Sequence, residues 1–383
     1  MRPILLSGLL WSVLSACAQQ FVLPGNSYQS PRLASRGVAT ELSTEFRKEF
    51  SLLPSHAPIL IGPAVTLASG EITKSGRELQ TFLMLDLKAL MPDRVVERMG
   101  GDVPVGSASV ITATVAYERP NPRMPEDAWF IIDLAVNNKE GRNRGSVAFR
   151  INARQFDPTP SRFFQQSPIF QTIGKKKESG NPGNSDVPAK SFREIENEAK
   201  SDRGIVAYEA GQYADAKKIF QEVSVREGSN LLALSGVYQS ELALGNKREA
   251  EAALDRLIDA GIEQGTLSFK FLFRVRSAEF RDDYDIAEQY AHWISRVANR
   301  LSKSSKCLRV EGHASRSGSA VLNEALSKKR ADRVSQLLVQ QSSDLKLRIK
   351  SSGLGFSKNI VGSGTDDATD AVDRRVEFVL HSC

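Results

Sequence analysis

The chain carries few side chains in arrangements that support catalysis or metal binding. Its four histidines, at positions 56, 292, 313 and 381, are far apart and show no metal-ligand spacing. The sequence also contains no nucleophile motif and no phosphate-binding loop. We therefore expect a protein that is not an enzyme and that needs no metal and no cofactor.

The composition is that of an ordinary globular chain with a basic balance. Its 383 residues exceed one average domain, and its hydrophobic content of 41% and charged content of 25% are typical of soluble domains. The net charge is +6, yet lysine and arginine are spread along the chain, and three lysines in a row occur only at Lys175-Lys176-Lys177. No zinc-finger spacing or arginine-rich helix is present, so we expect no nucleic acid among the partners.

The N-terminus has the form of an export signal. Arg2 precedes an apolar stretch, residues 3–15 (PILLSGLLWSVLS), that is too short to span a bilayer but fits the core of a signal peptide. Leu14-Ser15-Ala16-Cys17 resembles the bacterial lipobox, which implies a signal peptide over 1–16 and a lipid on Cys17. Ala18 follows in place of an aspartate, which implies the outer membrane, with the chain facing the periplasm. A plain secreted protein is the alternative.

Two segments of low apolar content divide the chain. Residues 17–37 are rich in Pro, Gly, Ser and Gln and predict a lipidated tether, and residues 174–193 predict a linker. Between them, residues 38–173 predict an α+β periplasmic domain. Helical spacing occurs at Leu42, Phe46 and Phe50 and again over 79–90, while a short apolar run, 58–62, predicts a strand.

Three further stretches of this domain alternate as strands, 109–117, 129–136 and 146–153, with a hairpin loop at 137–141. We expect one antiparallel sheet. The order of elements loosely resembles periplasmic lipoprotein domains of the LpoB and CsgG type, although no specific motif carries that likeness.

Residues 194–262 contain an internal repeat. Gly211 and Gly245 are 34 residues apart, and the same offset relates Ala216 to Ala250 and Phe220 to Leu254. This period, with small residues at the helix contacts, resembles the tetratricopeptide repeat and implies a helical module that binds partner proteins. An ordinary four-helix connector is the alternative.

The C-terminal part, residues 265–383, changes to a mixed pattern. Strands are predicted over 268–280, 307–313, 345–352 and 375–381, and helices over 286–301 and 323–339. This βαβαββ order predicts helices on one side of a mixed sheet. The chain as a whole is therefore expected to be a multidomain α+β protein with an all-α middle.

Several separated motifs in this part resemble the OmpA-like peptidoglycan-associating domain. The first block is Glu311-Gly312-His313-Ala314, followed by Gly318, Asn323, Leu326-Ser327 and Arg330-Ala331. Gly353-Leu354-Gly355-Phe356-Ser357 and Arg374-Arg375-Val376-Glu377 match the later blocks in order and spacing.

The resemblance implies a pocket that binds the diaminopimelate side chain of a peptidoglycan stem peptide. Arg330 falls on the family arginine that forks onto the ligand carboxylate. Ser315 replaces a family aspartate that accepts the ligand ammonium, and Arg276 stands at a second acidic or amide position. His313, Asn323 and Arg375 complete the expected ligand-binding set. A structural hydrogen bond is the alternative for His313, and a loop brace is the alternative for Asn323.

The same resemblance implies that the last strand lies antiparallel beside the second, which would bring Cys383 near Cys307. The two cysteines can then form a disulfide in an oxidising periplasm.

Our leading hypothesis is an outer-membrane lipoprotein that docks on peptidoglycan and scaffolds periplasmic proteins. The alternative is an accessory component of an envelope machine, such as a secretion or pilus apparatus, whose OmpA-like domain contacts proteins. A third idea, regulation of wall synthesis by the N-terminal domain, rests on fold analogy alone.

Overall fold

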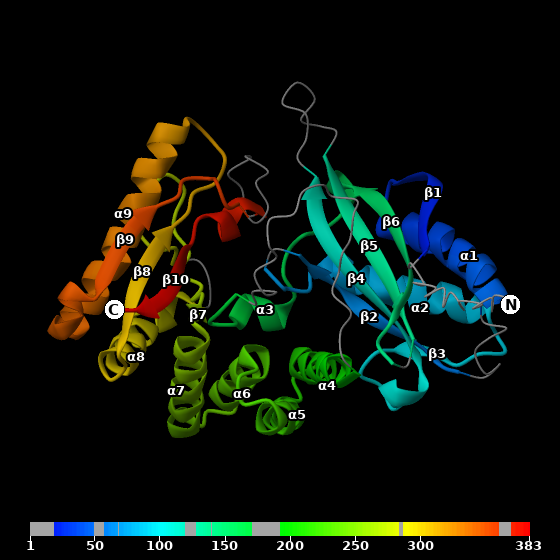
Figure 1. Ribbon diagram of the computed structural model, residues 1–383, viewed down its shortest axis with the longest axis horizontal. Coiled ribbons are helices and arrows are strands. Elements are labelled where there is room, and N and C mark those ends of the chain that lie inside the picture. The colour runs from blue at the N-terminus through cyan, green and yellow to red at the C-terminus, as the bar shows by residue number, and fades with distance from the viewer. Residues whose placement is uncertain are drawn as a thin grey trace, which may run out of the picture.

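The computed structural model describes residues 19–49, 57–67, 69–118, 128–138, 140–170, 192–282, 286–359 and 369–383. Two sheets lie at opposite ends of the molecule, and helices α4 to α7 form a row that connects them (Figure 1). Within the described ranges no helix combines the length and apolarity needed to cross a membrane. The signal peptide and the lipidation site Cys17 lie outside the described residues.

The N-terminal sheet has six strands in the order β1-β6-β5-β4-β2-β3. Its elements are β1 (Gln19–Tyr28), α1 (Pro31–Glu49), β2 (Ile59–Thr66), α2 (Lys74–Leu90), β3 (Val96–Arg98), β4 (Ser109–Glu118), β5 (Trp129–Asn137) and β6 (Asn143–Asn152). Only β5 runs antiparallel to its neighbours, β4 and β6, whereas β1 runs parallel to β6 and β2 runs parallel to both β3 and β4. The expectation of one antiparallel sheet was therefore wrong, and the sheet is mixed.

The residues buried in the core of this domain follow the hydrophobic spacing predicted from the sequence. Along β5, Phe130, Ile132 and Leu134 are buried, as two-residue alternation requires. On α2, the buried residues Leu79, Leu83 and Leu87 follow at four-residue spacing. Helices α1 and α2 pack against each other, and their apolar residues join those of the sheet in one cluster.

The predicted tether, 17–37, differs most from its expectation. Over its described part it forms β1 and the first turns of α1, because Ala34 and Val38 begin a buried stripe that continues to Leu42. Gly37, whose type indicated a flexible segment, lies where an added Cβ would be 2.5 Å from the Tyr28 hydroxyl. The small residues of this segment thus serve close packing rather than chain freedom.

The middle of the chain forms two helix pairs, α4 (Phe192–Glu209) with α5 (Tyr213–Arg226) and α6 (Leu231–Ala243) with α7 (Lys247–Gln264). Their turns repeat the 34-residue offset in detail. Gly211 and Gly245 have φ values of 78° and 77°. The amides of Gln212 and Asn246 donate to the carbonyls of Ala207 and Glu241, which are also 34 apart. The assignment of these pairs to the tetratricopeptide class stays a prediction, and the predicted linker, 174–193, lies almost entirely outside the described residues.

The C-terminal sheet has the strand order β7-β10-β8-β9. Its elements are β7 (Thr266–Leu267), α8 (Tyr290–Ser302), β8 (Lys306–Gly312), α9 (Ala320–Gln341), β9 (Ile349–Gly353) and β10 (Val376–Ser382). β10 runs antiparallel to β7 and β8, and β8 runs parallel to β9. Short helices elsewhere are α3 (Arg162–Gln166), η2 (Val105–Ser107), η3 (Ala153–Gln155), η4 (Ala287–Gln289), η5 (Ser343–Leu347) and η6 (Thr369–Asp373).

The sequence predicted a strand over 268–280, and this prediction was wrong. Only Thr266 and Leu267 pair with β10, and the following residues are irregular apart from two isolated bridges, Phe269 with Ile169 and Phe273 with Phe280. The alternating side chains that predicted a strand, Phe269, Phe271 and Phe273, are buried in the core instead. Their two-residue spacing indicates only that these side chains are buried, and side chains of an irregular segment can be buried in the same way.

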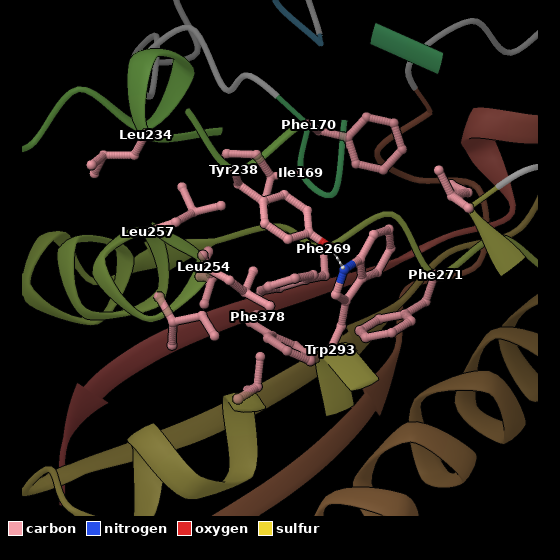
Figure 2. Close-up of a cluster of buried hydrophobic side chains, with 14 of the residues drawn as sticks. Ile169, Phe170, Leu234, Tyr238, Leu254, Leu257, Phe269, Phe271, Trp293 and Phe378 are labelled. Atoms are coloured by element: carbon pink, nitrogen blue, oxygen red, sulfur yellow. Dashed lines mark hydrogen bonds between the residues drawn. The ribbon is translucent and has the colours of Figure 1, made fainter. Parts of the chain in front are cut away.

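The C-terminal sheet and the helical pairs share one apolar cluster. Phe269 packs against both Trp293 and Phe378, and Leu254 of α7 joins the same cluster (Figure 2). Phe163, Phe164, Ile169 and Phe170, which the sequence assigned to the domain ending at 173, also belong to it. This cluster therefore includes residues that the sequence assigned to the N-terminal domain.

Candidate functional site

The loop after β8, residues 313–319, is the centre of the candidate site. Close approach of α9 to the sheet positions this loop, because an added Cβ on Gly312 would lie 1.9 Å from the Ser327 carbonyl oxygen. The Ser327 hydroxyl accepts a hydrogen bond from the Gly355 amide, 2.9 Å, and the Gly355 carbonyl accepts one from the Ala314 amide, 2.8 Å. The two glycine-containing blocks recognised in the sequence thus meet at one place.

Arg330 is fully buried at this site, with 0% exposure. Its Nε donates to the carbonyl of Ser277 at 2.9 Å and its two terminal nitrogens donate to those of His313, 2.9 Å, and Arg274, 3.1 Å. The guanidinium also lies 5.3 Å from the centre of the Phe273 ring. In this arrangement Arg330 ties the turn 274–277 to the end of β8.

The turn held by Arg330 carries Arg276. Among the described residues, Arg276 is the one non-glycine residue with a positive φ, 53°, and its side chain is exposed. A left-handed conformation costs a residue with a Cβ of order 1 kcal/mol or more, which the surrounding contacts must offset. The bonds from Arg330 to both sides of this turn provide such contacts.

Ser315 and Asn323 occupy the two ends of the loop region. Ser315 is buried, with 4% exposure, and so is Asn323, with 6%. The Asn323 side chain donates to the Ser317 carbonyl at 2.6 Å, and Ser319 caps α9 by accepting from the Leu322 amide. Asn323 therefore braces the loop, and the position of the family aspartate lies against the protein interior.

His313 and Arg375 extend the site onto β10. The His313 amide donates to the Arg375 carbonyl at 2.9 Å, and the Arg375 guanidinium pairs with the Glu377 carboxylate. The His313 ring is completely buried, and Nε2 lies 3.7 Å from Glu377 Oε2. Burial and the nearby Arg375 charge lower the pKa of His313 below its ordinary value. Burial alone would raise the pKa of Glu377, but Arg375 and His313 outweigh it and hold that pKa well below its usual range.

The fold assembles a group that sequence spacing did not reveal. Single ligand-type atoms of Glu311, His313 and Glu377 lie within 4.8 Å of one another. Arg309 and Lys358 pair with Glu311, at 2.7 and 3.4 Å, and Arg375 pairs with Glu377. Three cations thus face two carboxylates, so the group is already charge-compensated and does not favour a divalent ion. The alternation of Arg309, Glu311 and His313 along β8 was the available sequence signal.

All five residues expected to bind ligand, His313, Ser315, Asn323, Arg330 and Arg375, therefore surround one loop. Their proximity is a finding of the structure, whereas their contact with a ligand stays a prediction. The structure also joins Cys307 and Cys383 by a disulfide, with the Cα atoms 4.9 Å apart, because β10 pairs His381 with Cys307.

Comparison with known proteins places this region in a family. Residues 280–372 match the OmpA family. The C-terminal domain is OmpA-like. That match covers the β8 loop, α9 and β9, so the buried Arg330 and the motif blocks up to Ser357 lie within it, whereas the block 374–377 follows it. No curated protein matches the chain.

Solved structures similar to part of this chain include three envelope proteins. The peptidoglycan-associated lipoprotein from Burkholderia pseudomallei is 25% identical, covering 29% of this chain and 88% of that one, with a TM-score of 0.25. The cell wall anchor of the T6SS from Pseudomonas aeruginosa is 24% identical over 34% and 97%, with a TM-score of 0.26. An outer membrane protein from Borrelia burgdorferi B31 is 26% identical over 30% and 86%, with a TM-score of 0.24.

Proposed function

We propose that this protein is an outer-membrane lipoprotein that associates non-covalently with peptidoglycan through its OmpA-like domain. The observation that supports this most is that the family match, 280–372, contains the loop after β8, around which five motif residues are gathered. In this proposal the lipid on Cys17 holds one end of the chain in the membrane. The helix pairs α4–α7 scaffold periplasmic partner proteins, and no part of the chain is an enzyme.

The ligand in this proposal is the diaminopimelate side chain of a stem peptide, which carries one carboxylate and one ammonium. Arg330 supplies positive charge behind the loop and holds the His313 carbonyl at its start, so its role is positioning as well as attraction. The Ser315 hydroxyl offers an acceptor to the ammonium where the family has a full negative charge. Exchange of a charged partner for a neutral one forfeits about 1.5 kcal/mol, or about tenfold in affinity.

Weak binding at this loop is compatible with wall association in the cell. The lipid anchor and the wall contact belong to one molecule, so each binding event raises the effective concentration for the other. A modest affinity for each stem peptide then suffices, because the wall presents many copies of the peptide to a tethered domain.

Co-sedimentation with purified cell-wall sacculi tests the proposal on residues 18–383, which lack the lipid but keep the shared apolar core. We expect the chain to pellet with sacculi at low salt and to be released by excess soluble muropeptide. Ser315→Lys should lower the bound fraction about tenfold, because it places a cation where the ligand ammonium would lie. Ser317→Lys adds the same charge two residues further along the loop and should retain most of the binding.

The result that would overturn wall association is a folded wild-type chain that stays in the supernatant at low salt. Equal binding by wild type and Ser315→Lys would show instead that the wall is held elsewhere on the chain. Arg330→Ala is a poor test by itself, because it also releases the buried turn 274–277 from the end of β8.

A second candidate function is that of an accessory component of an envelope machine, in which the OmpA-like domain contacts proteins. The observation that favours it is the use of all three Arg330 nitrogens by backbone carbonyls. The replacements at Ser315 and Arg276 point the same way. Isolation of a stoichiometric complex from envelopes whose wall has been digested would support this candidate over the first.

A further inference from the structure

A pocket of about 310 Å³ opens where three parts of the chain meet. Arg162 and Gln166 come from α3, Tyr208 and Gln239 from the helix pairs, and Trp293 from α8 of the OmpA-like domain. This volume lies at the lower end of the range for small-molecule sites, and such sites often occur where domains meet. None of its lining residues belongs to the loop after β8.

Four aromatic side chains line part of the pocket and are fixed by packing. Tyr238 and Trp293 are joined by a hydrogen bond of 3.0 Å from the indole nitrogen to the phenol oxygen (Figure 2). Tyr208 packs edge-on against Tyr213 and donates to the Gln166 side chain at 2.8 Å. The rings therefore present a preformed apolar surface rather than one that a ligand must assemble.

The charge of the pocket is positive and comes from one side chain. Among the described lining residues Arg162 alone is charged, and no carboxylate is present. Arg162 is exposed, and one terminal nitrogen donates to the Tyr213 hydroxyl at 2.8 Å. A guanidinium held in this way favours an anion, and its planar fork fits a carboxylate.

One polar atom of the lining has no partner. Gln239 is 98% buried, and its Nε2 donates to the Ser235 hydroxyl at 3.0 Å. Its Oε1 is buried and accepts no hydrogen bond from any described residue. A buried acceptor without a donor costs about 1 to 3 kcal/mol. A ligand that brings an N–H group to Gln239 would satisfy it.

We propose that this pocket binds the carboxylate end of a peptide, that is, an N-acylated α-amino acid with an apolar side chain. The carboxylate pairs with Arg162, the amide N–H donates to the Gln239 carbonyl oxygen, and the side chain packs against the aromatic walls. The carboxyl terminus of a periplasmic protein and that of a wall stem peptide share this chemistry. The proposal is independent of wall docking by the loop after β8.

The test titrates residues 18–383 with N-acetyl-L-phenylalanine and with its carboxamide, followed through the Trp293 indole N–H resonance in NMR spectra. The signal is assigned with Trp293→Phe. We expect saturable binding of the acid, at least tenfold tighter than that of the amide. N-acetyl-D-alanine forms a second arm. Tighter binding of the D-alanine acid identifies the stem peptide as the source, and tighter binding of the L-phenylalanine acid identifies a protein terminus.

Three variants make the test specific. Arg162→Gln should abolish the preference for acid over amide, and Gln239→Leu should weaken binding of both by about tenfold. Arg248→Gln removes an exposed arginine of α7 outside the pocket and should bind like the wild type. The proposal is overturned if no acid binds saturably, if acid and amide bind equally, or if Arg162→Gln retains the preference.

Discussion

The two sheets are joined to the central helices by different kinds of contact. Between the helices and the C-terminal sheet the joint is apolar and continuous, with Leu254, Phe269 and Trp293 in one cluster. Between the N-terminal sheet and α4 a smaller apolar cluster, which includes Leu60, Val110 and Ile195, is accompanied by buried ion pairs. Arg77 of α2 pairs with Asp202 of α4 at 2.6 Å, and Glu71 pairs with Lys270, which follows β7.

The two kinds of contact contribute differently to stability and to orientation. Apolar burial stabilises roughly in proportion to area and tolerates small rearrangement. A buried ion pair adds little net stability, but it penalises any arrangement that separates its partners. We infer that the helix pairs and the OmpA-like domain fold as one unit, whereas the ion pairs fix how the N-terminal sheet is oriented on that unit.

The largest expected effect comes from breaking the apolar joint. Phe269→Ala removes a ring with 0% exposure that contacts Phe271, Trp293 and Phe378, and should cost about 4 kcal/mol of unfolding free energy. Hydrogen exchange followed by mass spectrometry should show faster exchange in α7 and in β10 together, with the N-terminal sheet little changed. Faster exchange in the C-terminal sheet alone would contradict a shared folding unit.

A slightly smaller loss is expected at the polar joint. Lys270 donates to the Glu71 carboxylate and to the Phe164 carbonyl, so Lys270→Met leaves Glu71 charged and buried, at a cost of about 3 kcal/mol. Adding Glu71→Leu should recover most of the loss in denaturant titrations. Lys74→Met serves as the control, because its 3.7 Å pair with Asp157 is exposed and should contribute below about 1 kcal/mol. If the double variant stays as unstable as Lys270→Met, then the Lys270–Glu71 pair stabilises the fold by more than neutralising two buried charges.

The smallest expected effect is a pH dependence of stability that arises from His313 and Glu377, at the C-terminal sheet. In the unfolded chain His313 takes up a proton at its ordinary pKa of 6.5. In the folded chain its pKa is lowered, so protonation favours unfolding. Stability should therefore fall as the pH drops below 6.5, until the folded pKa is reached. The low pKa of Glu377 adds a further loss only below its ordinary value of 4.5.

His313→Gln should reduce the dependence of the melting temperature on pH between 7.5 and 5.5, whereas His381→Gln, at an exposed position, should leave it as it is. Arg375, Glu377 and Glu311 face the His313 ring and remain in both variants. An unchanged pH dependence in His313→Gln would show that the ring does not resist protonation.

The sequence predicted elements whose signal is local. The alternation in β5 and the four-residue spacing in α2 are set by neighbours along the chain, and both elements formed where expected. Residues 17–37 and 268–280 were misjudged because Ala34 and Phe269 gain their burial from distant segments. The motif residues of the candidate site were found, but the burial of Arg330 depends on a turn more than 50 residues earlier, which no local pattern reports.

The most direct measurement of the central claim is a calorimetric titration of residues 18–383 with a purified stem peptide that contains diaminopimelate. Wall association predicts weak saturable binding by the wild type and about tenfold tighter binding by Ser315→Asp, which restores a negative charge toward the ligand ammonium. Ser317→Asp should bind like the wild type. If neither the wild type nor Ser315→Asp binds the peptide, the OmpA-like domain of this protein does not dock on the wall through this loop.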